Sequence, residues 1–389
     1  MPEQQAAIND CIEKAVDIHA QALDFWAKGQ LEDAEALTVQ ALAILEQCIG
    51  SEQPDVVNLL IHLAGICVEM GRQAEAEPLY RRALWILEQI GADGVELVQL
   101  HIHALNELAS LHRYQGRYPA AEPLLLTALT IGERSLEKDH PLIADTLNQL
   151  GILYKYQGRF AEAQPLYHRA LVILKEKLGT NHPRVADIYH NLGGLEHAQG
   201  RYAEGEPYAR RSVAIRTQSF GPEHPDVAAD KAALAALLDG QGLYEEAETL
   251  YRQAIDVFEA CFGAEHYELG VNYNNLAALY HARGEDTQAE PLFWRALNIK
   301  QKIFGGDHPD VAMTLNNLGV FYQSQGRDGE AEPLLRRALS IFEATLGSDH
   351  PHTISCRQNH TQCRTAVMGK NSRVTPDLSV ELLVSVEAK

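Results

Sequence analysis

The stretch "HPDVAMTLNNLG", from His308 to Gly319, decides the architecture of this chain because near copies of it recur. "HPLIADTLNQLG" begins at His140 and "HPRVADIYHNLG" begins at His182. The same histidine returns every 42 residues, at His140, His182, His224, His266, His308 and His350. Proline follows each of them except at Tyr267. A fixed period of this length indicates a repeat architecture.

Glycines repeat with the same period and mark eight units. They are Gly29, Gly71, Gly116, Gly158, Gly200, Gly242, Gly284 and Gly326. Successive members lie 42 residues apart, except for a step of 45 between Gly71 and Gly116. Each glycine stands where one helical pattern ends and the next begins, so each unit is predicted to be a helical hairpin.

The last complete unit shows the two helices most clearly. The first, predicted over 309–325, carries apolar residues at a spacing of three to four: Val311, Leu315, Leu318 and Tyr322. Pro309 suits a first helical turn, and Gly326 suits the left-handed backbone that follows a helix end. The second helix is predicted over 329–346.

Small residues recur at one position of each helix, where neighbouring helices are expected to pack closely. In the first helices they are Ala64, Ala109, Gly151, Gly193, Ala235, Ala277 and Gly319. In the second helices they are Ala34, Ala76, Ala121, Ala163, Gly205, Ala247, Ala289 and Ala331. One hairpin cannot bury its apolar faces alone, whereas stacked hairpins share a continuous core. The sequence therefore predicts an all-α solenoid.

These small residues, with a late alanine in each hairpin, resemble the tetratricopeptide repeat. The 42-residue unit, with H-P-D-V-A, L-N-N-L and A-E-P-L-x-x-R-A-L, is similar to the repeats of kinesin light chains and their bacterial relatives. The resemblance implies a right-handed superhelix whose first helices line a concave groove. It covers eight repeats over 13–350, which follow an N-terminal segment 1–12. After residue 350 the pattern begins a further first helix and then fades, which predicts a capping helix over 351–368 and a tail over 369–389.

The tail has lost the repeat pattern and is expected to be flexible, although its stretch "VELLVSV" is apolar enough to dock onto another surface.

The overall composition excludes several classes of protein. A formal net charge of −20 opposes binding to nucleic acid, whose phosphates would be repelled. The six cysteines include no C-x-x-C pair, so neither a disulfide framework nor a zinc finger is expected. The polar N-terminus is unlike a secretory signal, and no apolar run reaches the roughly 18 residues of a membrane helix. A cytoplasmic protein without membrane association is predicted.

Two groups of residues that include histidine could be considered as metal sites, but the spacing of neither group favours metal binding. Histidines one repeat apart lie about 8–10 Å from each other, too far to share one metal, so they are predicted to serve the loops and helix starts. Cys356, His360 and Cys363 fall on one helical face, where metal binding or a reactive thiol competes with simple packing. Packing is favoured because no fourth ligand has a fixed spacing. No cofactor and no metal are predicted.

The candidate binding residues lie on the first helices, on the face that the resemblance assigns to the groove. They are Asn106, Arg113, Tyr114, Asn148, Lys155, Tyr156, His190, Asn191, His197, Asn274, Asn275, His281, Asn316 and Asn317. Asparagine is a mediocre helix former, so its recurrence in mid-helix needs a reason. Either each amide bonds to the neighbouring repeat and orients the stack, or it clamps the backbone of an extended peptide. Both hypotheses remain open at this point.

The sixth repeat interrupts this pattern. "DVAADKAALAALLDGQG" places Ala229, Ala232, Ala233 and Ala236 where other repeats carry asparagine or larger side chains. The polar face is therefore expected to divide into one part in repeats three to five and another in repeats seven and eight.

No phosphate-binding loop, H-E-x-x-H or G-x-S-x-G motif is present, so the chain is not expected to be an enzyme. The leading hypothesis is a scaffold that binds an extended peptide or a partner helix in its groove. The alternative is a self-associating structural module, a homo-oligomer, whose groove accepts another copy or the chain's own tail.

Overall fold

The structure is a computed structural model that describes residues 2–91 and 94–369. Seventeen helices and no strand occur in these residues, as the sequence predicts for an all-α solenoid. The predicted tail lies outside the described part of the chain, apart from Gly369 at its start. The chain forms two compact units, residues 1–150 and 151–389, whose boundary falls within α7.

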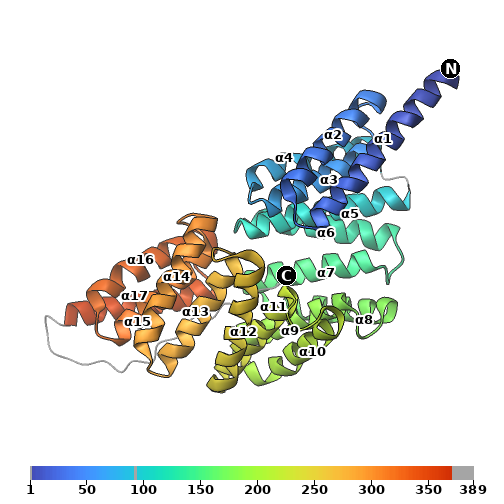
Figure 1. The fold of residues 1–389 in the computed structure, drawn as a ribbon. Coiled ribbons are helices and arrows are strands. Elements are labelled where there is room, and N and C mark those ends of the chain that lie inside the picture. The colour runs from blue at the N-terminus through green and yellow to red at the C-terminus, as the bar shows by residue number, and fades with distance from the viewer. Residues whose placement is uncertain (1, 92–93, 370–389) are drawn as a thin grey trace. The chain divides into compact units, whose positions relative to one another are not determined.

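Unit 1 consists of antiparallel hairpins that lie side by side (Figure 1). Its helices are α1 (Pro2–Ala27), α2 (Leu31–Ile49), α3 (Pro54–Glu69), α4 (Gln73–Ile90), α5 (Val95–Tyr114), α6 (Tyr118–Ser135) and the first part of α7 (Pro141–Tyr156). The first helix begins at Pro2, well ahead of residue 13.

Unit 2 continues the same pattern of a first, inner helix followed by a second, outer helix. Its helices after α7 are α8 (Phe160–Leu178), α9 (Pro183–Ala198), α10 (Tyr202–Phe220), α11 (Pro225–Gly240), α12 (Tyr244–Phe262), α13 (Tyr267–Ala282), α14 (Asp286–Phe304), α15 (Pro309–Ser324), α16 (Asp328–Thr345) and α17 (Pro351–Gly369). The final helix α17 packs against α15 and α16.

The periodic histidines cap the first helices, which confirms the loop role predicted for them. In His308 the ring nitrogen Nδ1 accepts a hydrogen bond from the backbone N–H of Asp310, at 3.1 Å. The same bond forms at every other member of the series, at 3.1–3.4 Å. Such a bond satisfies one of the amides that a helix start leaves without a partner.

The periodic glycines end the first helices, as predicted. Gly326 has a φ of 72°, a left-handed conformation that costs glycine little because it has no Cβ. Its N–H bonds to the carbonyl of Gln323 at 2.9 Å, and the N–H of Arg327 bonds to the carbonyl of Tyr322 at 2.9 Å. These two bonds satisfy the last carbonyls of α15 and turn the chain into α16.

The small residues lie where helices of one hairpin meet. A Cβ built on Gly319 in α15 would stand 2.6 Å from Cγ of Leu335 in α16. One on Gly151 would stand 2.7 Å from the Tyr167 ring. By contrast, a Cβ on Gly193 would meet its nearest neighbours at 3.5 Å, an ordinary contact. The periodic small residues therefore fit close packing at some repeats and are less constrained at others.

One cysteine expectation was wrong, because Cys11 in α1 and Cys48 in α2 form a disulfide. Their Cα atoms lie 6.5 Å apart across the first hairpin. The two cysteines are 37 residues apart in the sequence, so only the antiparallel pairing of α1 with α2 brings them together. Among the described residues, no helix is both long and apolar enough to cross a membrane.

Candidate binding face

The inner face of unit 2 is the side of each first helix that points away from the outer helices. In α15, the residues Val311, Leu315 and Leu318 belong to the core shared with the outer helices. A helix turns about 100° per residue, so a different stripe lies opposite this core. That stripe consists of Met313, Asn316, Asn317, Val320 and Gln323, of which Met313 and Val320 also belong to the buried apolar cluster.

Asparagines of the inner face are joined from repeat to repeat. Asn317 in α15 donates from Nδ2 to Oδ1 of Asn274 in α13, at 3.3 Å. Asn359 in α17 donates in the same way to Asn316 in α15, at 3.1 Å. Within α13, Asn274 donates to Asn275 at 3.2 Å. These bonds support the hypothesis that the asparagines orient the stack.

The inner face of α15 is closed to solvent. Every residue from Pro309 to Gln323 is buried, although the helix is polar at Asp310, Asn316 and Asn317. The Gln323 side chain is 3% exposed, and neither its Nε2 nor its Oε1 has a hydrogen-bond partner. A buried amide without partners costs about 1–3 kcal/mol, so Gln323 is a group suited to a ligand.

A buried charge cluster joins α9, α10 and α11. Arg216 donates from Nη1 to Oδ1 of Asp230 at 2.7 Å, and its Nη2 pairs with Asp187. His190, predicted as a groove residue, instead bonds through Nδ1 to the same Asp230 oxygen at 2.7 Å. Arg216 and Asp230 are 1% and 0% exposed. Each partner compensates the burial of the others, so this cluster holds three helices in register.

The other predicted residues of unit 2 are buried or already paired. Lys155, Asn191 and His197 are buried, and Tyr156 is half-buried. Burial, with smaller contributions from Lys155 and His352, lowers the pKa of His197 to about 3. His281 bonds through Nδ1 to Oδ1 of Asp286 at 2.8 Å. None of these residues presents the fully exposed side chain that an open groove would show.

Four of the predicted residues lie in unit 1: Asn106, Arg113, Tyr114 and Asn148. Asn106 in α5 is buried and donates from Nδ2 to the hydroxyl of Thr146 in α7, at 3.0 Å. This bond again links one repeat to the next. Arg113, Tyr114 and Asn148 are half-buried.

A contact that the sequence did not indicate ties the two ends of unit 2 together. His350, at the start of α17, bonds through Nε2 to the carbonyl of Tyr156 at the end of α7, at 2.6 Å. These residues are 194 positions apart. The ring of Pro351 lies so close to Gly158 that a Cβ there would meet it at 2.6 Å. Periodicity cannot reveal such a contact, because it depends on the curvature accumulated over five repeats.

The sequence profile of the tetratricopeptide repeat family matches residues 12–89, 101–176, 143–202, 184–260, 268–344 and 310–367. These matches span most of the chain. The chain belongs to the tetratricopeptide repeat family.

Three solved structures illustrate the similarity of fold. The Rap conjugation gene regulator of the plasmid pLS20, in complex with the Phr* peptide, is 14% identical with a TM-score of 0.61, covering 87% of this chain and 96% of its own. A Rap protein complexed with Competence and Sporulation Factor is 13% identical, with a TM-score of 0.58, covering 92% and 99%. BtubC (BKLC) from P. vanneervenii is 23% identical, with a TM-score of 0.42, covering 75% and 99%. No curated protein matches the sequence.

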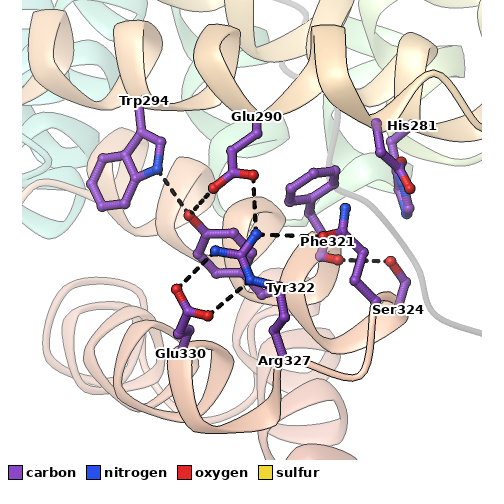
Figure 2. A network of polar contacts seen from close by, with 10 residues as sticks. His281, Glu290, Trp294, Phe321, Tyr322, Ser324, Arg327 and Glu330 are labelled. Carbon is purple, nitrogen blue, oxygen red and sulfur yellow. Dashed lines mark hydrogen bonds and ion pairs between the residues drawn. The ribbon is translucent and has the colours of Figure 1, made fainter.

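Successive tetratricopeptide units are also joined by arginine–glutamate pairs, which Figure 2 shows for α14 and α16. Arg327, directly before α16, bonds to Glu290 in α14 at 3.0 Å and to Glu330 in α16 at 2.8 Å. Its guanidinium lies 3.9 Å from the centre of the Tyr322 ring. The Tyr322 hydroxyl donates to Glu290 at 2.8 Å and accepts from Nε1 of Trp294 at 2.9 Å.

The same pair recurs at earlier units. Arg72 bonds to Glu35 at 2.6 Å, and Arg117 bonds to Glu77 at 2.5 Å. The signal in the sequence is an arginine directly after the periodic glycine, with a glutamate directly after the small residue in the second helix of the preceding tetratricopeptide unit: Glu35 in "AEA", and Glu77 and Glu290 in "AEP". Sequence reasoning missed these pairs because a glutamate near a helix start is already explained by the helix dipole. In the sixth unit Leu243 replaces the arginine.

The C-terminal cysteine and histidine cluster has the contacts of a packed helix. Cys356 and Cys363 are buried, and each sulfur lies 3.7 Å from a carbonyl oxygen of α16, that of Leu335 and that of Asp328 respectively. His360 lies 3.4 Å from Glu332. Among the described residues, no group of three or more potential ligands is arranged to hold a metal ion.

Proposed function

We propose that this tetratricopeptide repeat protein is a non-catalytic interaction scaffold that binds an extended peptide along the inner face of its first helices. The observation that carries the proposal is the row of amides on α13 and α15, with the unpartnered Gln323 at its end. An amide offers both a donor and an acceptor, so a row of them suits a peptide backbone, which repeats the same two groups.

The row matches an extended chain in spacing. Neighbouring helices pack about 8–10 Å apart, which is close to the length of three extended residues. A peptide that crosses two first helices would therefore meet an amide at every third residue. Support from similar folds comes from the Rap regulator of pLS20, whose structure contains the Phr* peptide.

The test is a random peptide display selection with the full chain as bait. We expect extended peptides to be retained, and Gln323→Ala to weaken their binding about two- to tenfold, the equivalent of one hydrogen bond. Gln323 bonds to no partner through its side chain, so its replacement breaks no hydrogen bond within the fold. The control is Arg336→Ala, on the outer helix α16 and 68% exposed, which is expected to leave binding unchanged.

Selection of no peptide would refute the proposal. Peptides that respond to Arg336→Ala and not to Gln323→Ala would place binding on the outer surface. Light scattering of the purified chain distinguishes the alternative, since a self-associating module would show a mass that rises with concentration.

A further inference from the structure

The sixth repeat has an apolar, solvent-excluded inner face. By helix register, Ala229, Ala232, Ala233 and Ala236 occupy the positions in α11 that Met313, Asn316, Asn317 and Val320 occupy in α15, and all four are buried. The helices packed on α11 among the described residues are α9, α10, α12 and α13. A row of alanines at these positions is apolar, where other repeats carry amides, and it is therefore suited to contact with apolar side chains.

The amide row lies directly beside this alanine surface. Helices α11, α13, α15 and α17 follow one another as inner neighbours. A ligand lying across them would therefore meet alanines on α11 and amides on α13 and α15. This combination suits an extended segment whose backbone is polar and whose alternate side chains are apolar.

The chain carries such a segment after Gly369, where α17 ends. By sequence, "LSVELLVSV" places Leu378, Val380, Leu382, Val384 and Val386 at every second position. Ser379, Glu381, Leu383 and Ser385 alternate with them, so this second edge is polar except at Leu383. In an extended conformation, this pattern gives one continuous apolar edge.

The length of the segment is sufficient to reach the alanine surface. Three steps of about 8–10 Å separate α17 from α11, so the distance is about 30 Å. Nine extended residues span about that length. Residues 370–378 would cover the distance, and residues 379–387 would remain for contact with α11.

We propose that the C-terminal segment 370–389 binds in cis to the inner face of unit 2, with its even-numbered apolar side chains on the alanines of α11. This inference rests on the proposed function, since it assigns a resident ligand to the same face. A tethered ligand acts at a high effective concentration, so the segment would compete with any external peptide.

The test uses three full-length chains and a fluorescently labelled synthetic peptide of residues 370–389. The variant Leu382→Asp/Val384→Asp places two charges on the apolar edge, and Ser379→Asp/Ser385→Asp places the same charges on the opposite edge. Fluorescence anisotropy measures the affinity of the peptide for each chain. We expect the first variant to bind the peptide at least tenfold more tightly than the wild type, because its own segment no longer competes. The serine variant should resemble the wild type.

Equal binding by all three chains, or binding by none, would overturn the inference. A wild-type mass that doubles with concentration and returns to that of a monomer in Leu382→Asp/Val384→Asp would assign the segment to a second copy, which also overturns it. If the segment fails to bind while peptides selected by display still respond to Gln323→Ala, only this inference fails. If neither binds, the proposed function fails as well.

Discussion

Replacing Arg216 with methionine should destabilise the middle of unit 2 more than any surface change. Methionine keeps the length of the side chain and removes its charge, which leaves the buried Asp230 carboxylate with the bond from His190 and without the bond from Arg216. Breaking a buried ion pair by removing one member costs about 3–5 kcal/mol. Because His190 still bonds to Asp230, we expect the free energy of unfolding to fall by an amount near the lower end of this range, about 3 kcal/mol. Asp187 contributes less because it is partly exposed.

The assay is urea denaturation combined with hydrogen exchange. Repeat proteins open locally, so exchange in α9, α10 and α11 should accelerate before the rest of the chain responds. The matched control is Arg210→Met on the same helix. Arg210 is 46% exposed and pairs with Glu206 at 2.7 Å, so its loss should cost about 1 kcal/mol or less.

The double variant Arg216→Met/Asp230→Asn removes both charges and should recover part of the lost stability. Equal denaturation midpoints for Arg216→Met and the wild type would refute the argument, since they would mean that the Asp230 carboxylate is not held by Arg216. An effect of Arg210→Met as large as that of Arg216→Met would refute it too.

Two further predictions concern packing and pH. Gly319→Ala should lower the free energy of unfolding in urea by about 1–3 kcal/mol, because the new Cβ would stand 2.6 Å from Leu335. Gly193→Ala should be neutral or stabilising, because a Cβ there has its nearest neighbours at 3.5 Å. Equal effects of the two substitutions would show that the helix contacts are misassigned. Burial lowers the pKa of His197 from 6.5 to about 3, so below pH 6.5 the unfolded state binds a proton that the folded state does not. Stability should fall with decreasing pH by up to about 1.4 kcal/mol per unit, and His197→Gln should lose this dependence. An unchanged pH dependence in thermal melts of His197→Gln would contradict the assignment.

Local signals in the sequence were enough to predict the helices and the residues at which the helices end. His308, Pro309 and Gly326 act within one turn of the chain, through a cap, a fixed φ and a left-handed residue, so their effect does not depend on distant contacts. The period of 42 residues then required the hairpins to stack, because no single hairpin can bury its apolar face. The order of the helices and the repeat family follow from these features.

The candidate binding face was predicted only in part. The sequence placed Asn274, Asn316 and Asn317 on one face, but it could not distinguish bonds between repeats from a peptide clamp. That distinction depends on which amides come within about 3 Å of each other, and helix periodicity carries no such information. His190 shows the limit most clearly, since its aspartate and arginine partners lie on two other helices.

The sequence by itself determined what short-range chemistry controls: helix starts, helix ends, the repeat period and the face to which each residue belongs. Only the tertiary structure decided the Cys11–Cys48 disulfide, the contact of His350 with Tyr156 and the burial of the inner face. The physical reason is that small rotations between neighbouring repeats add up along a solenoid. Residues far apart in the sequence meet or separate according to that sum, which no single repeat encodes.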